Sequence, residues 1–192
     1  MVTSTSQVKE LRERTGAGIM DCKRALEESA GDLEVATSIL RQQGLAKAEK
    51  KAGRAASQGL VEPYIHGAGR IGSIVEVNCE TDFVARTPDF RELAHDLAMQ
   101  VAATSPRVVS EQEIPDAEWP ALEQEFGSRK QALEAVSLLD QPYIKDGRRT
   151  VQDLVRESIA KVGENIVVRR FARFEVGADL SEATAEEQAS TT

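Results

Sequence analysis

The chain has 192 residues and a formal net charge of −8, and 41% of its residues are hydrophobic but only 4% aromatic. This length suggests one or two domains with an aliphatic core, and the acidic balance argues against a general nucleic-acid binder, which is normally basic. No apolar run approaches the roughly 20 residues of a membrane span, and residues 1–6 lack the pattern of a secretory signal. Cys22 and Cys79 have no metal-ligand spacing, which favours reduced thiols in a cytoplasmic protein over a disulfide.

Residues 4 to about 43 predict three short helices, separated by Thr15-Gly16-Ala17-Gly18 and by Gly31. Asp32 is placed to cap the third helix by accepting bonds from its first free N–H groups. The inward side chains, by helical spacing, are predicted to be Val8, Leu11, Ile19, Cys22, Ala25, Leu26, Val35, Ala36, Ile39 and Leu40. A bundle of some 40 residues is close to the lower limit for independent folding.

Residues 45–58 are rich in alanine, with Lys47, Lys50, Lys51 and Arg54 interleaved. Alanine favours helix, and the basic residues wind around its axis, so we expect a solvated linker helix. An RNA-binding patch is the alternative interpretation.

Residues 60–65 and 70–78 predict a hairpin closed by His66-Gly67-Ala68-Gly69, whose glycines can adopt the positive φ of a tight turn. Pro63 lacks an N–H for the ladder, which places the first strand at an edge of the sheet.

Residues 79–90 connect this hairpin to a strongly periodic helix. Asp82-Phe83 sets a carboxylate beside a large ring in a short connection, where a scaffold often presents functional groups. A phenylalanine that folds back to anchor the hairpin is an equally weighted alternative. Thr87 and Pro88 favour a helix start. The following apolar face is expected to cover the hairpin and comprises Phe90, Leu93, Ala94, Leu97, Ala98 and Val101.

The remaining third predicts helices from Asp116 to Gly127 and from 130 to 138, a turn at Asp146-Gly147, and a helix capped by Thr150 with Asp153. A final strand then alternates. One side is predicted to carry Ile166, Val168, Ala172, Phe174 and Val176, and the other Val167, Arg169, Phe171 and Arg173. Residues 178–192 are acidic with almost nothing large and apolar, which predicts a disordered tail.

No catalytic constellation is recognisable. His66 and His95 have no nucleophile at motif spacing, and no glycine-rich loop is followed by Lys-Ser/Thr, so we expect no bound nucleotide. We also expect no cofactor, no metal and no enzymatic activity. The pattern predicts a protein that acts by binding another protein.

Three stretches, in this order along the chain, resemble signatures of the bacterial elongation factor Ts family. They are Leu11-Arg12-Glu13-Arg14-Thr15-Gly16-Ala17-Gly18-Ile19-Met20-Asp21-Cys22-Lys23, Val77-Asn78-Cys79-Glu80-Thr81-Asp82-Phe83-Val84-Ala85-Arg86, and Gly163-Glu164-Asn165-Ile166-Val167-Val168-Arg169-Arg170-Phe171. The resemblance implies an α+β fold. It would comprise a three-helix module of the ubiquitin-associated type (1–44), a linker helix (45–58), an α/β core with a small antiparallel sheet packed by helices (59–177) and the tail (178–192).

The same resemblance implies a guanine-nucleotide exchange factor for elongation factor Tu. Residues Thr81, Asp82, Phe83 and Val84 would enter the GTPase near its switch helices and displace Mg²⁺, with Phe83 as a wedge and Asp82 as a polar contact. Further partner contacts would be Lys9, Arg12, Thr15, Gly16, Met20 and Arg86, although Met20 is also readable as a core residue. Two alternatives are an adaptor built on the amino-terminal module and an RNA-binding translation accessory using residues 47–54 with Arg169, Arg170 and Arg173.

The chain is short for this family. It has residues for one α/β subdomain, and residues 107–137 look trimmed beside longer members. Short members restore the second subdomain by pairing, so the resemblance implies a homodimer formed through the edge strand and the final strand.

Overall fold

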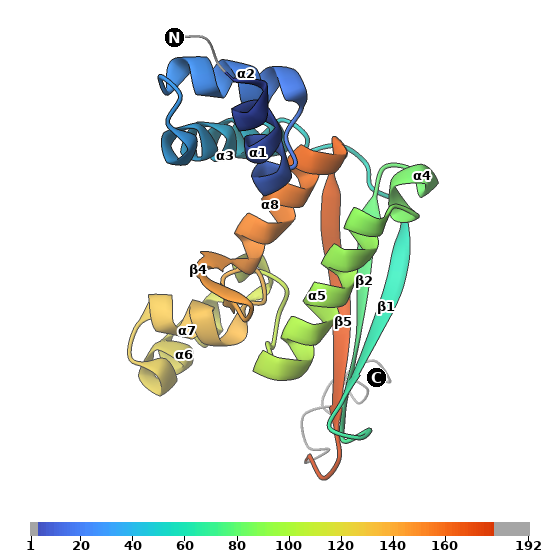
Figure 1. Cartoon of the computed structure of the whole chain (residues 1–192). Helices are drawn as coiled ribbons and strands as arrows, with labels where there is room; N and C mark the ends of the chain where they lie inside the picture. Colours follow the sequence, from blue (N-terminus) through green and yellow to red (C-terminus); the bar gives the residue numbers. More distant parts are fainter. Residues whose placement is uncertain (1–3, 179–192) are drawn as a thin grey trace.

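The computed structural model describes residues 4–178, apart from the side chains of Leu45 and Lys47, and has the predicted α+β fold (Figure 1). The tail prediction lies outside these residues except at Ala178. The elements in chain order are α1 (Thr5–Thr15), α2 (Ile19–Glu28), α3 (Leu33–Glu49), β1 (Gln58–His66), β2 (Ile71–Cys79), α4 (Asp82–Ala85), α5 (Pro88–Thr104), η1 (Glu111–Glu113), η2 (Asp116–Glu118), α6 (Trp119–Phe126), α7 (Arg129–Val136), β3 (Pro142–Tyr143), β4 (Asp146–Thr150), α8 (Val151–Val162) and β5 (Ile166–Glu175).

The main sheet is antiparallel with strand order β1-β2-β5. Pro63 therefore lies on an edge strand, as predicted. Helix α5 packs on β1 and β2 through the predicted apolar face, and α8 packs beside α5 on the same core (Figure 1). Phe90, Leu97 and Val101 are fully buried there. Burying each such side chain contributes roughly 1.5–3 kcal/mol, so this face holds α5 firmly on the hairpin.

Helices α1 to α3 pack around their own small cluster, which includes Leu11, Cys22 and Leu26. Asp32 caps α3 by accepting from the backbone N–H groups of residues 34 and 35, as predicted. Ile19 and Val35, however, are exposed. Both lie in the first turn of their helix, and the small residues Ala25 and Ala36 fill the centre of the bundle instead. The prediction that Ile19 and Val35 face inward is wrong.

The linker helix predicted for 45–58 is not a separate element. Helix α3 continues to Glu49, and Ala48 packs in the core beneath the sheet. The chain then turns, and the Asn165 side chain donates to the carbonyls of Ala52 (3.4 Å) and Arg54 (2.8 Å). This buried amide ties the turn that follows α3 to the start of β5.

Strand β5 contains a bulge that changes which side chains face the core. Val77 pairs with Val168, but the neighbouring Glu76 pairs with Arg170, so Arg169 has no partner in the register. The extra residue inverts the alternation after this point. Phe171 therefore packs on the core, whereas Phe174 points outward. The alternation predicted over the whole strand is correct only up to Val168.

The segment between α5 and α8 forms a third apolar cluster around Trp119 and Leu122 of α6 and Ala132 of α7. Gly127 ends α6 in the left-handed conformation (φ 90°). The predicted turn at Asp146-Gly147 is displaced: the turn lies at residues 144–145, and Asp146 begins β4. Thr150 and Asp153 form the predicted cap, here a reciprocal capping box.

Candidate functional site

The α4 turn places Phe83 in solvent. Thr81 caps this helix by accepting from the backbone N–H of Val84 (3.4 Å). Ala85 is buried and Val84 packs against the main core, so the turn is fixed from below. Phe83 is 79% exposed, more than any other exposed large apolar side chain of residues 4–178. The alternative in which Phe83 folds back onto the hairpin is wrong. We call residues Thr81 to Val84 the tip.

Two charged residues lie close to Phe83 along the chain. Asp82 and Arg86 form an ion pair of 2.7 Å, four residues apart, and both are exposed. Exposed pairs of this kind contribute about 0–1 kcal/mol. A partner can therefore exchange this contact for its own at little cost.

Thr81 is also bonded across the sheet to a residue that the sequence did not identify as functional. Its backbone N–H and its hydroxyl donate to the two carboxylate oxygens of Glu164, at 2.9 Å and 2.6 Å. Glu164 is 83 positions away in the sequence, and its contact follows from the β2–β5 register. Sequence patterns do not give that register.

The predicted contacts of the amino-terminal module gather on α1 and on the connection to α2. Lys9 and Arg12 are exposed on α1, and Lys9 pairs loosely with Glu13 (3.8 Å). The Thr15 hydroxyl donates a hydrogen bond to the Leu11 carbonyl (2.7 Å). Gly16, the first residue of the connection to α2, lies in the left-handed region with φ 65°.

Met20 is 66% exposed at the start of α2, so its interpretation as a core residue is wrong. In Figure 1 the three-helix module and α4 lie toward the same end of the molecule, and the β1–β2 turn lies at the other.

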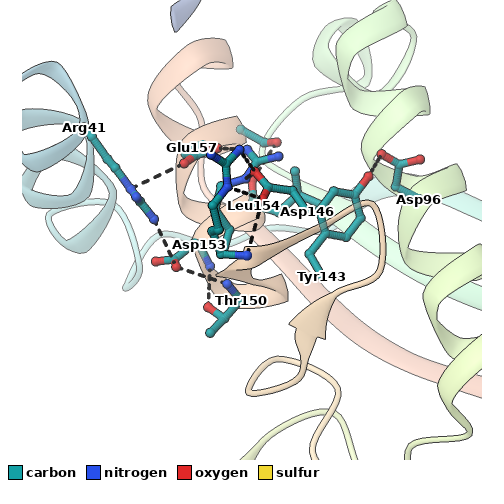
Figure 2. Close-up of polar contacts among 11 residues, drawn as sticks. Arg41, Asp96, Tyr143, Asp146, Thr150, Asp153, Leu154 and Glu157 are labelled. Carbon is teal, nitrogen blue, oxygen red and sulfur yellow. Dashed lines mark hydrogen bonds and ion pairs between the residues drawn. The ribbon is translucent and has the colours of Figure 1, made fainter. Parts of the chain in front are cut away.

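A network of ion pairs joins the module to the core (Figure 2). Arg41 of α3 reaches Asp153 (3.2 Å) and Glu157 (3.6 Å) on α8. Glu157 also pairs with Arg149 of β4 (2.7 Å), which bonds Asp146 (3.1 Å). Because these charges come from three elements, they constrain how the three-helix module sits on α8.

A buried carboxylate on α5 holds the β3–β4 hairpin. Asp96 accepts from the Tyr143 hydroxyl (2.5 Å) and pairs with Lys145 (2.6 Å). Figure 2 shows the Tyr143 ring pointing at Asp96 from the hairpin. Burial, followed by the bond to the Asp96 carboxylate, raises the pKa of Tyr143 above its ordinary value.

Three basic residues of the RNA-binding alternative form contacts within the protein. Arg170 pairs with Glu76 (2.7 Å), and Arg54 with Glu80 (3.5 Å). Arg173 is largely buried and bonds the Ala102 carbonyl (3.1 Å). These contacts oppose three of the charges that would track a phosphate backbone. Together with the formal net charge of −8, they do not favour this alternative.

Within residues 4–178, no group of three histidine, cysteine, aspartate or glutamate side chains is placed to hold a metal ion. No helix of that part is long and apolar enough to cross a membrane. Cys22 and Cys79 are buried free thiols, and burial raises the pKa of each.

The fold and the site together define an α+β protein that displays an exposed aromatic tip on a small sheet-and-helix platform beside a three-helix module. The family profile described as Elongation factor TS matches residues 44–132, which include the tip. Elongation factor Ts of Moorella thermoacetica is 54% identical over 91% of this chain and 95% of its own length. That of Coprothermobacter proteolyticus is 50% identical over 92% of this chain and 100% of its own. The chain belongs to the elongation factor Ts family.

Proposed function

We propose that this protein is a cytoplasmic guanine-nucleotide exchange factor that binds elongation factor Tu in its GDP form and promotes GDP release, without catalysing a covalent reaction. The observation that carries the proposal is the 79% exposure of Phe83 on a turn whose other apolar residues, Val84 and Ala85, pack against the main core. A ring that stays this exposed gains little from apolar burial in its own fold. Membership of the family supports elongation factor Tu as the partner that covers it.

The proposed mechanism is displacement. In a P-loop GTPase the nucleotide is held by loop amides, a lysine and a Mg²⁺ ion that neutralises phosphate charge. Phe83 enters as a wedge near the switch helices, and Asp82 changes the polar surroundings of the partner's metal. Because coupling between two ligands is reciprocal, a protein that weakens GDP binding must itself bind the nucleotide-free form more tightly.

Burial of the tip alone supplies too little binding free energy to release GDP. Shifting a two-state balance from 1:99 to 99:1 takes about 5.5 kcal/mol of differential binding, whereas burying one phenylalanine supplies roughly 1.5–3 kcal/mol. We therefore propose that the amino-terminal module, residues 1–44, docks on a second face of the GTPase domain while the core, residues 59–177, carries the tip. The amino-terminal module would contact the GTPase through Lys9, Arg12, Thr15, Gly16 and Met20. Arg86 would add one contact beside the tip.

The test is the release of fluorescently labelled GDP from the cognate elongation factor Tu, followed by stopped flow with excess unlabelled GDP. The proposal expects the release rate to rise with the concentration of this protein and then saturate. A folded protein that leaves the rate at its spontaneous value contradicts it. Binding to RNA or to ubiquitin without any change in GDP release would point to the two alternatives instead.

We also propose that the protein forms a homodimer through the outer face of the main sheet. Phe174 is 68% exposed there and lies opposite Gly72, which in turn pairs with Ile65. Ile74 and Val176 extend the apolar surface. An exposed sheet face with this content favours association, and a second copy of the same face would cover it symmetrically.

A further inference from the structure

We propose that Glu164 is a positioning residue for the tip: its carboxylate holds Thr81 so that α4 presents Phe83 outward. The inference rests on the proposed exchange function, because it concerns how the tip is held and not whether the tip is used. No property of Glu164 in the sequence alone indicates this role.

The contact lies where β2 and β5 separate. Their last register pair is Cys79 with Ile166, and beyond it the two chains diverge toward α4 and α8. Beyond this pair, two carboxylates bond backbone N–H groups of the opposite strand end, in a reciprocal pattern. Glu164 accepts the Thr81 N–H (2.9 Å), and Glu80 accepts the Asn165 N–H (2.7 Å). The strand ends are thus fastened at the point from which the tip projects.

Glu164 also sets the direction of the Thr81 hydroxyl. The hydroxyl donates its hydrogen to Glu164 (2.6 Å), so a lone pair of the same oxygen is left to accept the Val84 N–H at the helix start. The Thr81 carbonyl accepts from the Cys79 thiol (3.1 Å). Every polar group of Thr81 is therefore hydrogen-bonded. Phe83 lies only two residues further along the chain, so these bonds fix the start of the turn that carries it.

The energetic argument concerns the length of α4. A single turn gains few internal hydrogen bonds for the backbone entropy it costs, so its order depends on bonds from outside. Hydrogen bonds to a charged group are the stronger kind, and Glu164 supplies two of them. Without them the turn is expected to sample conformations in which Phe83 is not directed at the partner, which lowers the fraction of productive encounters.

The experiment is a double-mutant cycle in the labelled-GDP release assay, with Glu164→Ala, Phe83→Ala and the double variant. Glu125→Ala is the matched control, because Glu125 pairs with Arg107 on the exposed side of α6, away from the tip. We expect Glu164→Ala to reduce stimulation about tenfold, the size of change that loss of a charge-assisted bond causes. In the Phe83→Ala background it should cost less than about twofold, because residues that act as a unit are not additive.

The outcomes distinguish the wedge role of Phe83 from the positioning role of Glu164. If Phe83→Ala leaves stimulation unchanged, the wedge and this inference both fail. If Phe83→Ala impairs exchange but Glu164→Ala does not, or if the two losses are additive, Glu164 has no positioning role and the proposed function stands.

Two further variants keep the test decisive if Glu164→Ala unfolds. Glu164→Gln keeps the side-chain volume and one acceptor oxygen, so it should retain the melting temperature and lose part of the stimulation. Glu113→Gln makes the same change at a carboxylate that accepts the Val109 backbone N–H (3.0 Å) outside the tip, and it should stimulate GDP release like wild type. Loss of stimulation in Glu113→Gln equal to that in Glu164→Gln would contradict the inference.

Discussion

Gly44 of α3 faces Ala160 of α8 so closely that a Cβ atom built on Gly44 would lie 3.1 Å from the Cβ atom of Ala160. Glycine weakens a helix by roughly 1 kcal/mol relative to alanine, so its presence within α3 reflects this close crossing. Helix α3 supplies core residues to the three-helix module, and α8 supplies them to the main core. The crossing therefore sets where the module stands relative to the tip.

The first prediction concerns this crossing. Gly44→Leu would force α3 and α8 apart, and overpacking of this kind costs about 1–3 kcal/mol. We expect the free energy of unfolding, measured in urea, to fall by that amount, and stimulation of GDP release to fall because the two docking surfaces are misaligned. Ala46→Leu, at an exposed position of the same helix, is the control. Equal effects of the two variants would exclude a special role for the crossing.

The second prediction tests the ion pairs at the same junction. Arg41→Ala removes the contacts to Asp153 and Glu157 while leaving the Thr150–Asp153 capping box in place. Because these side chains are partly exposed, the loss of stability should be small, about 0.2–1 kcal/mol. It should shrink as salt is raised. A loss that is unchanged in high salt would show that Arg41 acts through packing and not through charge.

The third prediction follows from the raised pKa of Tyr143. In the unfolded chain this hydroxyl ionises near its ordinary pKa of 10.0, but in the folded chain it stays protonated to higher pH. Its contribution to stability is therefore complete below pH 10.0 and is lost as the pH rises above that value. Tyr143→Phe should be less stable than wild type at neutral pH, because it loses the bond to Asp96. The difference should narrow as the pH rises above 10.0. Urea unfolding at several pH values measures it, and a difference that widens over this range would contradict the assignment.

The fourth prediction concerns the homodimer. Phe174→Glu places a charge at the centre of the exposed sheet face, which a self-paired interface would have to bury twice. Sedimentation equilibrium at micromolar concentration should show a dimer for wild type and a monomer for the variant. Lys130→Ala, at an exposed position of α7, is expected to remain dimeric. A monomeric wild type that still accelerates GDP release would rule out the dimer as the working form.

Local patterns predicted most of the elements. The spacing of Phe90, Leu97 and Val101 predicted the buried face of α5, and Pro63 predicted the edge strand. These features succeed because each depends on residues that are near one another in the sequence. The same patterns do not decide whether Met20 is buried or exposed, because the apolar side chains of the ten-residue helix α2 do not all lie on one side.

The features that were missed depend on contacts between distant segments. The bulge beside Arg169 is set by pairing with β2, and it inverted the predicted orientation of Phe174. Asn165 fixes the turn between α3 and β1 by bonding carbonyls 113 and 111 positions away. Glu164 meets Thr81 only once the sheet has formed. Helical periodicity and turn chemistry carry no information on such pairs.

The most direct test of the central claim is the stimulation of labelled-GDP release from elongation factor Tu by the Phe83→Ala variant. Phe83 is exposed, so the variant should keep the melting temperature of wild type. Ile144→Ala, which removes another exposed apolar side chain, is the matched control. If burial of the ring in the partner contributes roughly 1.5–3 kcal/mol, stimulation should fall at least about tenfold in Phe83→Ala and remain unchanged in the control. Stimulation by Phe83→Ala equal to that of wild type would contradict the account.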